Sequence, residues 1–284
     1  MMLKNTFIHI PGIGIKIEER LWDSGILDWD SFKEPFQINL SHKKLESIER
    51  YLQESKEHLE SNNPKYFESL LPASQHWRMF SDFRDSTVYL DIETTGLNMW
   101  GFEITTISLY DGESIFCYVK DQNLEDFEKD INKYKVIVTY NGKSFDIPFI
   151  ERYFGINLPQ AHIDLRYILA SLGFSGGLKG CEKQLWIDRG NLEDVDGYFA
   201  VLLWYDYKQN KNQKALETLL AYNIQDTVNL ETLMVQAHNM KLRDFPFLKI
   251  HQLPVPKQPD ISFEADRKTI DRIKGQIYSG TDVY

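Results

Sequence analysis

The chain has 284 residues, of which 42% are hydrophobic and 26% are charged, as in an ordinary globular protein with a sizeable core. Its formal net charge of −10 argues against non-specific coating of duplex nucleic acid and favours a short substrate footprint. No apolar run approaches the roughly 18 residues of a membrane span, and the first residues lack a signal-peptide core. The two cysteines have no metal-binding spacing, so we expect a cytoplasmic protein with no membrane partner.

Residues 1–82 are expected to form a mainly helical region. The stretch 41–60 is charged and amphipathic, with leucine and isoleucine on one side, and Asn62-Asn63-Pro64 ends it. Near the N-terminus, Pro11-Gly12-Ile13-Gly14 resembles the hairpin of a helix-hairpin-helix element, although the preceding NTFIHI is typical of a strand. Two interpretations remain open. The turn either packs a small subdomain or lets the backbone approach a phosphate.

Residues 83–240 alternate between strand and helix patterns. The expected strands lie near 87–92, 103–110, 113–119 and 135–140, with a hairpin turn at Tyr110–Glu113. The expected helices lie near 124–134, 146–154, 164–172, 180–186, 198–207 and 214–238. This order predicts an α/β fold with a mixed sheet, an antiparallel meander joined by parallel pairing and flanked by helices. The proline-punctuated residues 241–284 are expected to run extended over the surface.

Two acidic residues follow the first of these strands. Asp91 and Glu93 come after the apolar run 88–90, and residues two apart in a strand share one face. Two carboxylates held that close repel each other unless a cation lies between them. Hard divalent cations such as Mg²⁺ prefer carboxylate oxygens, so this pair predicts one side of a metal site.

Two further elements offer acid to the same place. Asp146 opens the expected helix 146–154, a position where acidic residues and caps are common. Tyr222 and Asp226 are four residues apart in the expected helix 214–238 and therefore lie on one face of it. Three separate elements thus each direct a carboxylate toward what we expect to be a single site.

The order and spacing of these motifs resemble a known group of enzymes. DIETTGL, YNGKSFD and YNIQD are similar to the motifs of the DEDD (DnaQ-like) 3′→5′ exonuclease superfamily, and Tyr222 indicates its DEDDy branch. The DEDDh branch would have histidine where this chain has Ala221. YNGKSFDIPFI, HIDL, LKGCEKQLWI and YNIQDTVNLETL resemble, more closely, the predicted RNase H-like exonuclease family of the RNase_H_2 type. Trp186 departs from that pattern, because relatives tend to have glycine there.

The resemblance implies an RNase H-like fold and hydrolysis of phosphodiester bonds from the 3′ ends of single-stranded DNA or RNA. It implies two divalent cations, Mg²⁺ or Mn²⁺, held by Asp91, Glu93, Asp146 and Asp226. Asp91 is expected to bridge both ions, Glu93 and Asp226 to bind one, and Asp146 to bind the other. Tyr222 is expected to orient the attacking water.

Several residues are candidates for binding substrate. The backbone of Thr94, Thr95 and Gly96 is expected to meet the terminal nucleotide, with Leu97 wedged against its base. The further candidates in polar loops are Asn141, Lys143 and Lys179. Asp164 is expected to be a helix cap or to act behind the metal ligands, and the alternative is a direct metal ligand. The tryptophans, including Trp186, are expected to pack rather than to stack on bases.

Other functions remain open from the sequence alone. The same fold can serve as a catalytically weak nucleic-acid-binding module, as a structure-specific endonuclease or as a small-molecule phosphodiesterase. No polymerase or helicase motif is found in the chain, so such a partner would act in trans. DNA and RNA are not distinguished, because recognition of the 2′-hydroxyl leaves no readable motif here.

Overall fold

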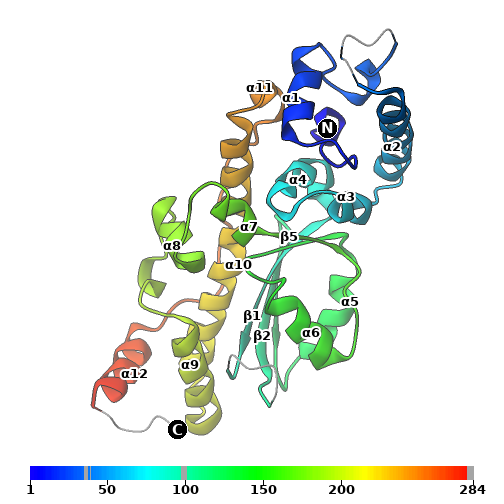
Figure 1. Ribbon diagram of the computed structural model, residues 1–284. Helices are drawn as coiled ribbons and strands as arrows, with labels where there is room; N and C mark the ends of the chain where they lie inside the picture. The colour runs from blue at the N-terminus through cyan, green and yellow to red at the C-terminus, as the bar shows by residue number, and fades with distance from the viewer. Residues whose placement is uncertain (35–37, 39, 97–100, 280–284) are drawn as a thin grey trace.

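A five-stranded sheet lies at the centre of the protein (Figure 1). The computed structural model describes residues 1–34, 38, 40–96 and 101–279. The strand order is β3-β2-β1-β4-β5, with the first three strands antiparallel and β1, β4 and β5 parallel. The strands are β1 Thr87–Thr94, β2 Ile104–Tyr110, β3 Ile115–Val119, β4 Val136–Thr139 and β5 Ala161–Asp164. The predicted mixed sheet with flanking helices is confirmed.

Helices cover both faces of the sheet and form the N-terminal region. The N-terminal helices are α1 Ile15–Asp23, α2 His42–Glu60, α3 Pro64–Leu70 and α4 Trp77–Phe83. The later helices are α5 Phe127–Ile131, α6 Asp146–Phe154, α7 Leu165–Ala170, α8 Gly177–Gln184, α9 Gly197–Asn210, α10 Gln213–Leu242, α11 Leu248–His251 and α12 Arg267–Ser279. Short 3₁₀ turns complete the pattern at Leu3–Asn5, Trp29–Ser31, Ala73–Gln75, Arg84–Ser86, Leu124–Asp126 and Gly190–Leu192.

The central strand β1 separates two hydrophobic clusters. Val88, Leu90 and Ile92 belong to the cluster that includes residues of α5 and α6. Tyr89 lies in the other cluster, which is built largely from α10 and the helices around it. Because strand side chains alternate between faces, Asp91 shares the Tyr89 face and points toward the α10 side.

Helix α10 spans 30 residues and runs along the sheet to the N-terminal region (Figure 1). It contains neither glycine nor proline, and it is buried along most of its length against the sheet, α9 and α7. A helix buried on most sides presents no single polar stripe, so packing rather than amphipathicity stabilises it. Within the described ranges, no helix is both long and apolar enough to cross a membrane.

The N-terminal region packs against the C-terminal end of α10 and the residues that follow it. Trp22 of α1 lies edge-on to Phe247, with ring centroids 5.4 Å apart, and Trp77 contacts His238 of α10. The His251 ring also hydrogen-bonds the Asn5 side chain over 2.7 Å. One hydrophobic cluster therefore continues across residue 82, and the division into domains at that position stays a prediction.

Three local expectations differ from the structure. Strand β5 was not among the predicted strands, because its four residues AHID include two polar ones and only pairing with β4 defines it. In NTFIHI only Asn5 belongs to a 3₁₀ turn, and none of its residues is in a strand. Residues 252–266 lack helix, as expected, but Leu248–His251 form α11 and Arg267–Ser279 form α12, whose Ile270 and Ile273 are buried and anchor it. The extended assignment was therefore wrong for these two helices.

The glycine turn before α1 is tightly packed. Gly12 has a φ of +82°, which favours glycine, and Ile13 donates its backbone N–H to the Ile10 carbonyl over 2.9 Å. Ile10 and Ile13 are buried, and Gly14 is the N-cap of α1. A packing role accounts for these contacts. The alternative, a contact with phosphate, stays a prediction.

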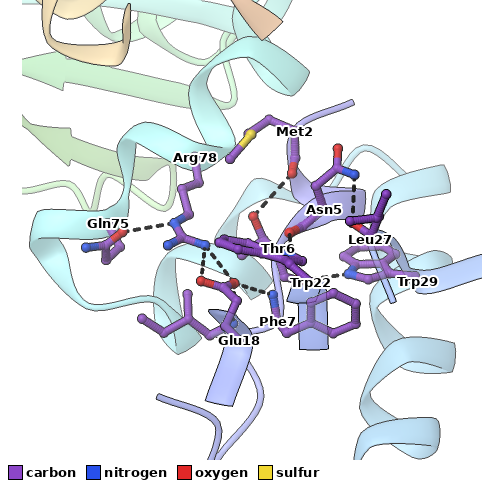
Figure 2. Close-up of polar contacts among 11 residues, drawn as sticks. Met2, Asn5, Thr6, Phe7, Glu18, Trp22, Leu27, Trp29, Gln75 and Arg78 are labelled. Atoms are coloured by element: carbon purple, nitrogen blue, oxygen red, sulfur yellow. Dashed lines mark hydrogen bonds and ion pairs between the residues drawn. The ribbon is translucent and has the colours of Figure 1, made fainter. Parts of the chain in front are cut away.

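A buried ion pair holds the N-terminal region together (Figure 2). The Arg78 guanidinium donates to both oxygens of Glu18 over 2.7 and 2.9 Å, and both side chains are almost fully buried. Glu18 also accepts the backbone N–H of Phe7 over 2.7 Å, while Arg78 donates to Gln75. The pair thus ties α1 to α4 and to the chain before the glycine turn.

Replacing Glu18 with Gln is expected to destabilise the fold by about 3–5 kcal/mol, because it leaves the Arg78 charge buried without a partner. The matched control Asp271→Asn removes an exposed ion pair with Arg267 and should leave the unfolding midpoint nearly unchanged. Thermal and urea unfolding followed by circular dichroism measure both. Equal midpoints for the two variants would contradict the stabilising role of the buried pair.

Candidate metal and catalytic site

The carboxyl end of β1 carries two acidic side chains on one face. Asp91 and Glu93 are both residues of the strand, which extends two residues further than the sequence predicted. Glu93 is buried and Asp91 is half-buried. A bulge at Glu93/Thr94 shifts the register with β2, so that Thr94 pairs with Ile104.

The long helix α10 brings the third carboxylate to this place. Asp226 is buried, and Tyr222 lies one helical turn before it. Carboxylate oxygens of Asp91, Glu93 and Asp226 all lie within 4.8 Å of one another. Asp226 lies 133 residues after Glu93 in the chain, so only the packing of α10 on β1 brings it to the two strand carboxylates.

The fourth carboxylate enters from the opposite side of β1. The parallel pairing of β1 with β4 extends to Tyr89↔Val138, and beyond it the two strands separate. Asp146, the first residue of α6, fills this gap and accepts the backbone N–H of Ile92 over 3.3 Å. Asp146 is buried and lies outside the group of three, but it lines the same cleft.

The carboxylates are held where ionisation is unfavourable. Burial, and then the charge of Asp226, raises the pKa of both Asp91 and Glu93 well above the usual range. Burial also raises the pKa of Asp146 to about 7, although the hydrogen bond from Ile92 opposes this shift. The cluster is therefore short of positive charge. An all-oxygen donor set of this kind fits hard divalent cations.

Arg189 partly offsets the negative charge and was not anticipated from the sequence. Its guanidinium forms a short ion pair with Asp226 Oδ1 and donates to Glu182 over 2.6 Å. Asn229 of α10 donates to the other Glu182 oxygen, also over 2.6 Å. Arg189 follows α8 in an irregular segment, and no local pattern indicates that it folds back onto α10. The second oxygen of Asp226 remains for a cation.

Asn223 is a second partner that the sequence did not single out. Its side-chain amide donates to Asp91 Oδ2 over 2.7 Å, and it is fully buried on α10. Because Asn223 lies three residues before Asp226, one face of the helix both contributes a carboxylate and orients another. That spacing is visible in the sequence once the pairing of α10 with β1 is known.

Tyr222 lies beside the cluster, almost fully buried. Burial, and then the nearby charge of Asp226, raises the pKa of its phenol strongly. The Lys179 ammonium lies 5.2 Å and the Arg189 guanidinium 5.4 Å from the centre of its ring. Its hydroxyl therefore stays protonated and can serve as a hydrogen-bond donor.

A cleft of about 830 Å³ opens over these side chains. Of the predicted substrate-binding residues, it is lined by Thr94, Thr95, Gly96 and Asn141. Leu97, the predicted wedge, lies outside the described residues. Gly96 packs so closely on Phe102 that a Cβ would come within 2.5 Å of the ring. Phe102 and Tyr198 line the cleft and are partly exposed, and the sequence did not indicate either of them.

The remaining polar candidates lie around the cleft rather than in it. Asp164 caps α7 through Arg166 N–H, and it accepts the backbone N–H of Asn141 and Lys143 over 2.7 and 3.1 Å. It thus shapes the loop before Asp146, which agrees with the interpretation as a cap. The Lys143 ammonium lies 3.3 Å from Glu68, and neither Lys143 nor Lys179 lines the cleft.

The raised carboxyl pKa values predict how stability without metal depends on pH. Asp146 titrates near 7 when folded and near 3.8 ordinarily, so the folded state binds the proton more tightly. The ionised Asp146 carboxylate therefore destabilises the folded state in full above pH 7, and protonation relieves this effect as the pH falls toward 4. In EDTA, Asp91→Asn should raise the thermal midpoint at pH 8 by removing one of the like charges, and this gain should shrink at pH 5.

Addition of Mg²⁺ or Mn²⁺ at pH 8 should raise the midpoint of the wild type more than that of Asp91→Asn. Asp260→Asn, an exposed acid outside the cleft, is the control and should behave as the wild type does. A gain from metal that is equal in Asp91→Asn and the wild type would show that the cations bind elsewhere.

Comparisons with known proteins found a similar solved structure and a matching family model. The structure is similar to a family B DNA polymerase from the hyperthermophilic archaeon Pyrobaculum calidifontis, with a TM-score of 0.44 and 15% identity over 60% of this chain. The chain spans only 26% of that polymerase. No curated protein matches the sequence. A family model described as the RNase H superfamily matches residues 88–238, more than half of the chain and the part that holds all four carboxylates. The chain therefore belongs to the RNase H superfamily.

Proposed function

We propose that this protein is a metal-dependent 3′→5′ exonuclease that hydrolyses single-stranded DNA or RNA. Membership in the RNase H superfamily suggests a nuclease. The observation that carries the finer proposal is the buried cluster of Asp91, Glu93 and Asp226, with Asp146 and Tyr222 around one cleft. The tyrosine four residues before the last aspartate favours the DEDDy branch of the DnaQ-like exonucleases.

The carboxylates are the proposed ligands of two divalent cations. Asp91 would contact both ions, Glu93 and Asp226 would hold one, and Asp146 would hold the other. When bound, such ions lower the pKa of the attacking water and stabilise the charge that builds on the leaving 3′ oxygen. The donor set supports Mg²⁺ and Mn²⁺ equally, because both accept oxygen ligands.

Two protein groups set the geometry of these ligands. Asn223 holds one oxygen of Asp91 over 2.7 Å and leaves the other free to turn toward a cation. Arg189 does the same for Asp226, and its charge stabilises the ionised carboxylate. A ligand that is oriented beforehand loses less entropy when the cation binds.

Tyr222 is the proposed donor to the attacking water. Since its phenol pKa is raised, it stays neutral and cannot act as a base near neutral pH. A hydrogen bond from its hydroxyl would hold the attacking water in line with the phosphorus. The neighbouring carboxylates would accept the proton that this water loses. This role agrees with its position one helical turn from Asp226.

The cleft supports an end-binding site. Thr94, Thr95 and Gly96 line it together. Thr95 donates its backbone N–H to the Glu103 carbonyl over 2.9 Å, and its hydroxyl accepts the Glu103 N–H over 3.0 Å. These three residues form the proposed seat of the terminal nucleotide, with Asn141 also in the cleft lining and Leu97 as the proposed wedge. A polymerase or helicase that delivers the strand in trans stays a prediction.

A time course on 5′-labelled single-stranded DNA and RNA of equal sequence tests the proposal. In Mg²⁺ or Mn²⁺ we expect a ladder that shortens from the 3′ end, and EDTA should abolish it. Asp91→Asn should reduce cleavage below detection while the protein stays folded, and Asp260→Asn should leave it unchanged.

The products distinguish the alternatives. Internal fragments without a mononucleotide product would indicate an endonuclease. Intact substrate with every metal, together with measurable binding, would indicate a nucleic-acid-binding module. Full cleavage by Asp91→Asn would overturn the assignment of the metal site.

Tyr222→Phe isolates the proposed role of the phenol. It should lower kcat by about 10²-fold with little change in KM, because only orientation of the water is lost. The profile of rate against pH should keep its shape, since a neutral donor does not titrate in the working range. A rate equal to that of the wild type would mean that the carboxylates and metals alone position the water.

A further inference from the structure

Trp186 is the most exposed large hydrophobic side chain in the described part of the protein. Its side chain is 93% exposed. It follows α8 directly and has a φ of +60°, in the left-handed region that favours glycine. The expectation that it packs was therefore wrong, and neither burial nor backbone preference explains a tryptophan here.

The backbone around Trp186 forms a regular helix end. Trp186 donates its N–H to the Lys183 carbonyl over 3.3 Å, and Ile187 donates to the Glu182 carbonyl over 2.9 Å. This pair of bonds is the Schellman motif, whose left-handed residue is most often glycine. A tryptophan at this position disfavours the motif and contributes no packing in return. The indole is therefore available for a partner.

The indole borders a hollow of about 450 Å³ on the outer side of α8. Lys179 and Lys183 line it together with Trp186, and lysines four residues apart lie on one face of the helix. Among the residues that the structure describes, neither ammonium group forms an ion pair with a carboxylate. An aromatic face beside two cations that have no carboxylate partner fits a base and its phosphate.

The hollow adjoins the candidate catalytic site. Arg189 lines the hollow and contacts Asp226, while Lys179 lies over the ring of Tyr222. Leu178, the residue before Lys179, lines the catalytic cleft. The two cavities are thus lined by residues that are adjacent in the chain or in direct contact.

Three acidic residues line the hollow and limit what it can hold. Glu182 is buried and paired with Arg189, whereas Asp188 and Glu193 are exposed. The negative charges of these two residues would repel the phosphates of a second strand, so the surface is unsuited to a duplex. A single nucleotide, with its phosphate toward the lysines of α8 and its base on the indole, would contact the positive groups and avoid the acidic ones.

We infer that this hollow binds a nucleotide of the single-stranded substrate outside the catalytic cleft, with Trp186 stacking on the base and Lys179 and Lys183 contacting the phosphate. The inference rests on the proposed nuclease function, which it extends to the path of the strand. It accounts for an exposed tryptophan in a strained position and for binding of a polyanion by a protein of net charge −10.

The variant Trp186→Gly separates binding from folding. Glycine suits the left-handed backbone, so the thermal midpoint should equal or exceed that of the wild type. Affinity for labelled single-stranded DNA and RNA, measured by fluorescence anisotropy in the Asp91→Asn background, should fall by about 5- to 150-fold, the effect of losing one base stack. Trp186→Phe should restore most of it. Tyr153→Ala, which removes a partly exposed aromatic from α6, is the matched control.

A small substrate distinguishes failure of this inference from failure of the proposed function. Trp186→Gly with its native Asp91 should hydrolyse the p-nitrophenyl ester of thymidine 5′-monophosphate as the wild type does, but should have a lower kcat/KM on oligonucleotides. Unchanged oligonucleotide affinity and turnover in Trp186→Gly would overturn the inference and leave the nuclease intact. A wild type that cleaves neither substrate would overturn the proposed function itself.

Discussion

Repulsion among buried carboxylates is the constraint on which this structure depends. Asp91, Glu93 and Asp226 offer oxygens within 4.8 Å of one another, and burial raises the pKa of the first two. Like charges at this distance interact strongly wherever water screens them poorly. Asn223 and Arg189 relieve only part of the repulsion, one by a hydrogen bond and the other by charge. An added divalent cation would therefore relieve the repulsion that remains at this site.

The rest of the molecule supplies the rigidity that such a site needs. Strand β1 is paired on both sides up to Tyr89, and beyond that point β4 leaves room for Asp146. Helix α10 is buried from the sheet to the N-terminal region, where His238 contacts Trp77. Movement of Asp226 would therefore disturb packing at both ends of the helix. Tertiary packing, rather than local preference, holds the carboxylates together.

The distribution of charge bears on how an acidic chain would bind the proposed nucleic-acid substrate. The positive groups near the cleft are few, and each has a distinct environment. Arg189 is committed to Asp226 and Glu182, whereas Lys179 and Lys183 have no carboxylate partner in the described ranges. Contacts with a few phosphates and one exposed indole suit a single strand held over a short length. The general acidity of the surface then disfavours long stretches of duplex.

The sequence by itself determined the elements whose signal is local. The spacing of Asp91 and Glu93 in an apolar strand, the boundaries of α6 at 146–154 and the pairing of Tyr222 with Asp226 on one helix are all read from periodicity. Only the tertiary structure decided the rest. Strand β5 exists because β4 pairs with it, and Arg189 joins the site because its segment folds back onto α10. Trp186 is exposed because no side chain of the described residues covers its indole. Such features depend on contacts between residues far apart in the chain, which no local pattern encodes.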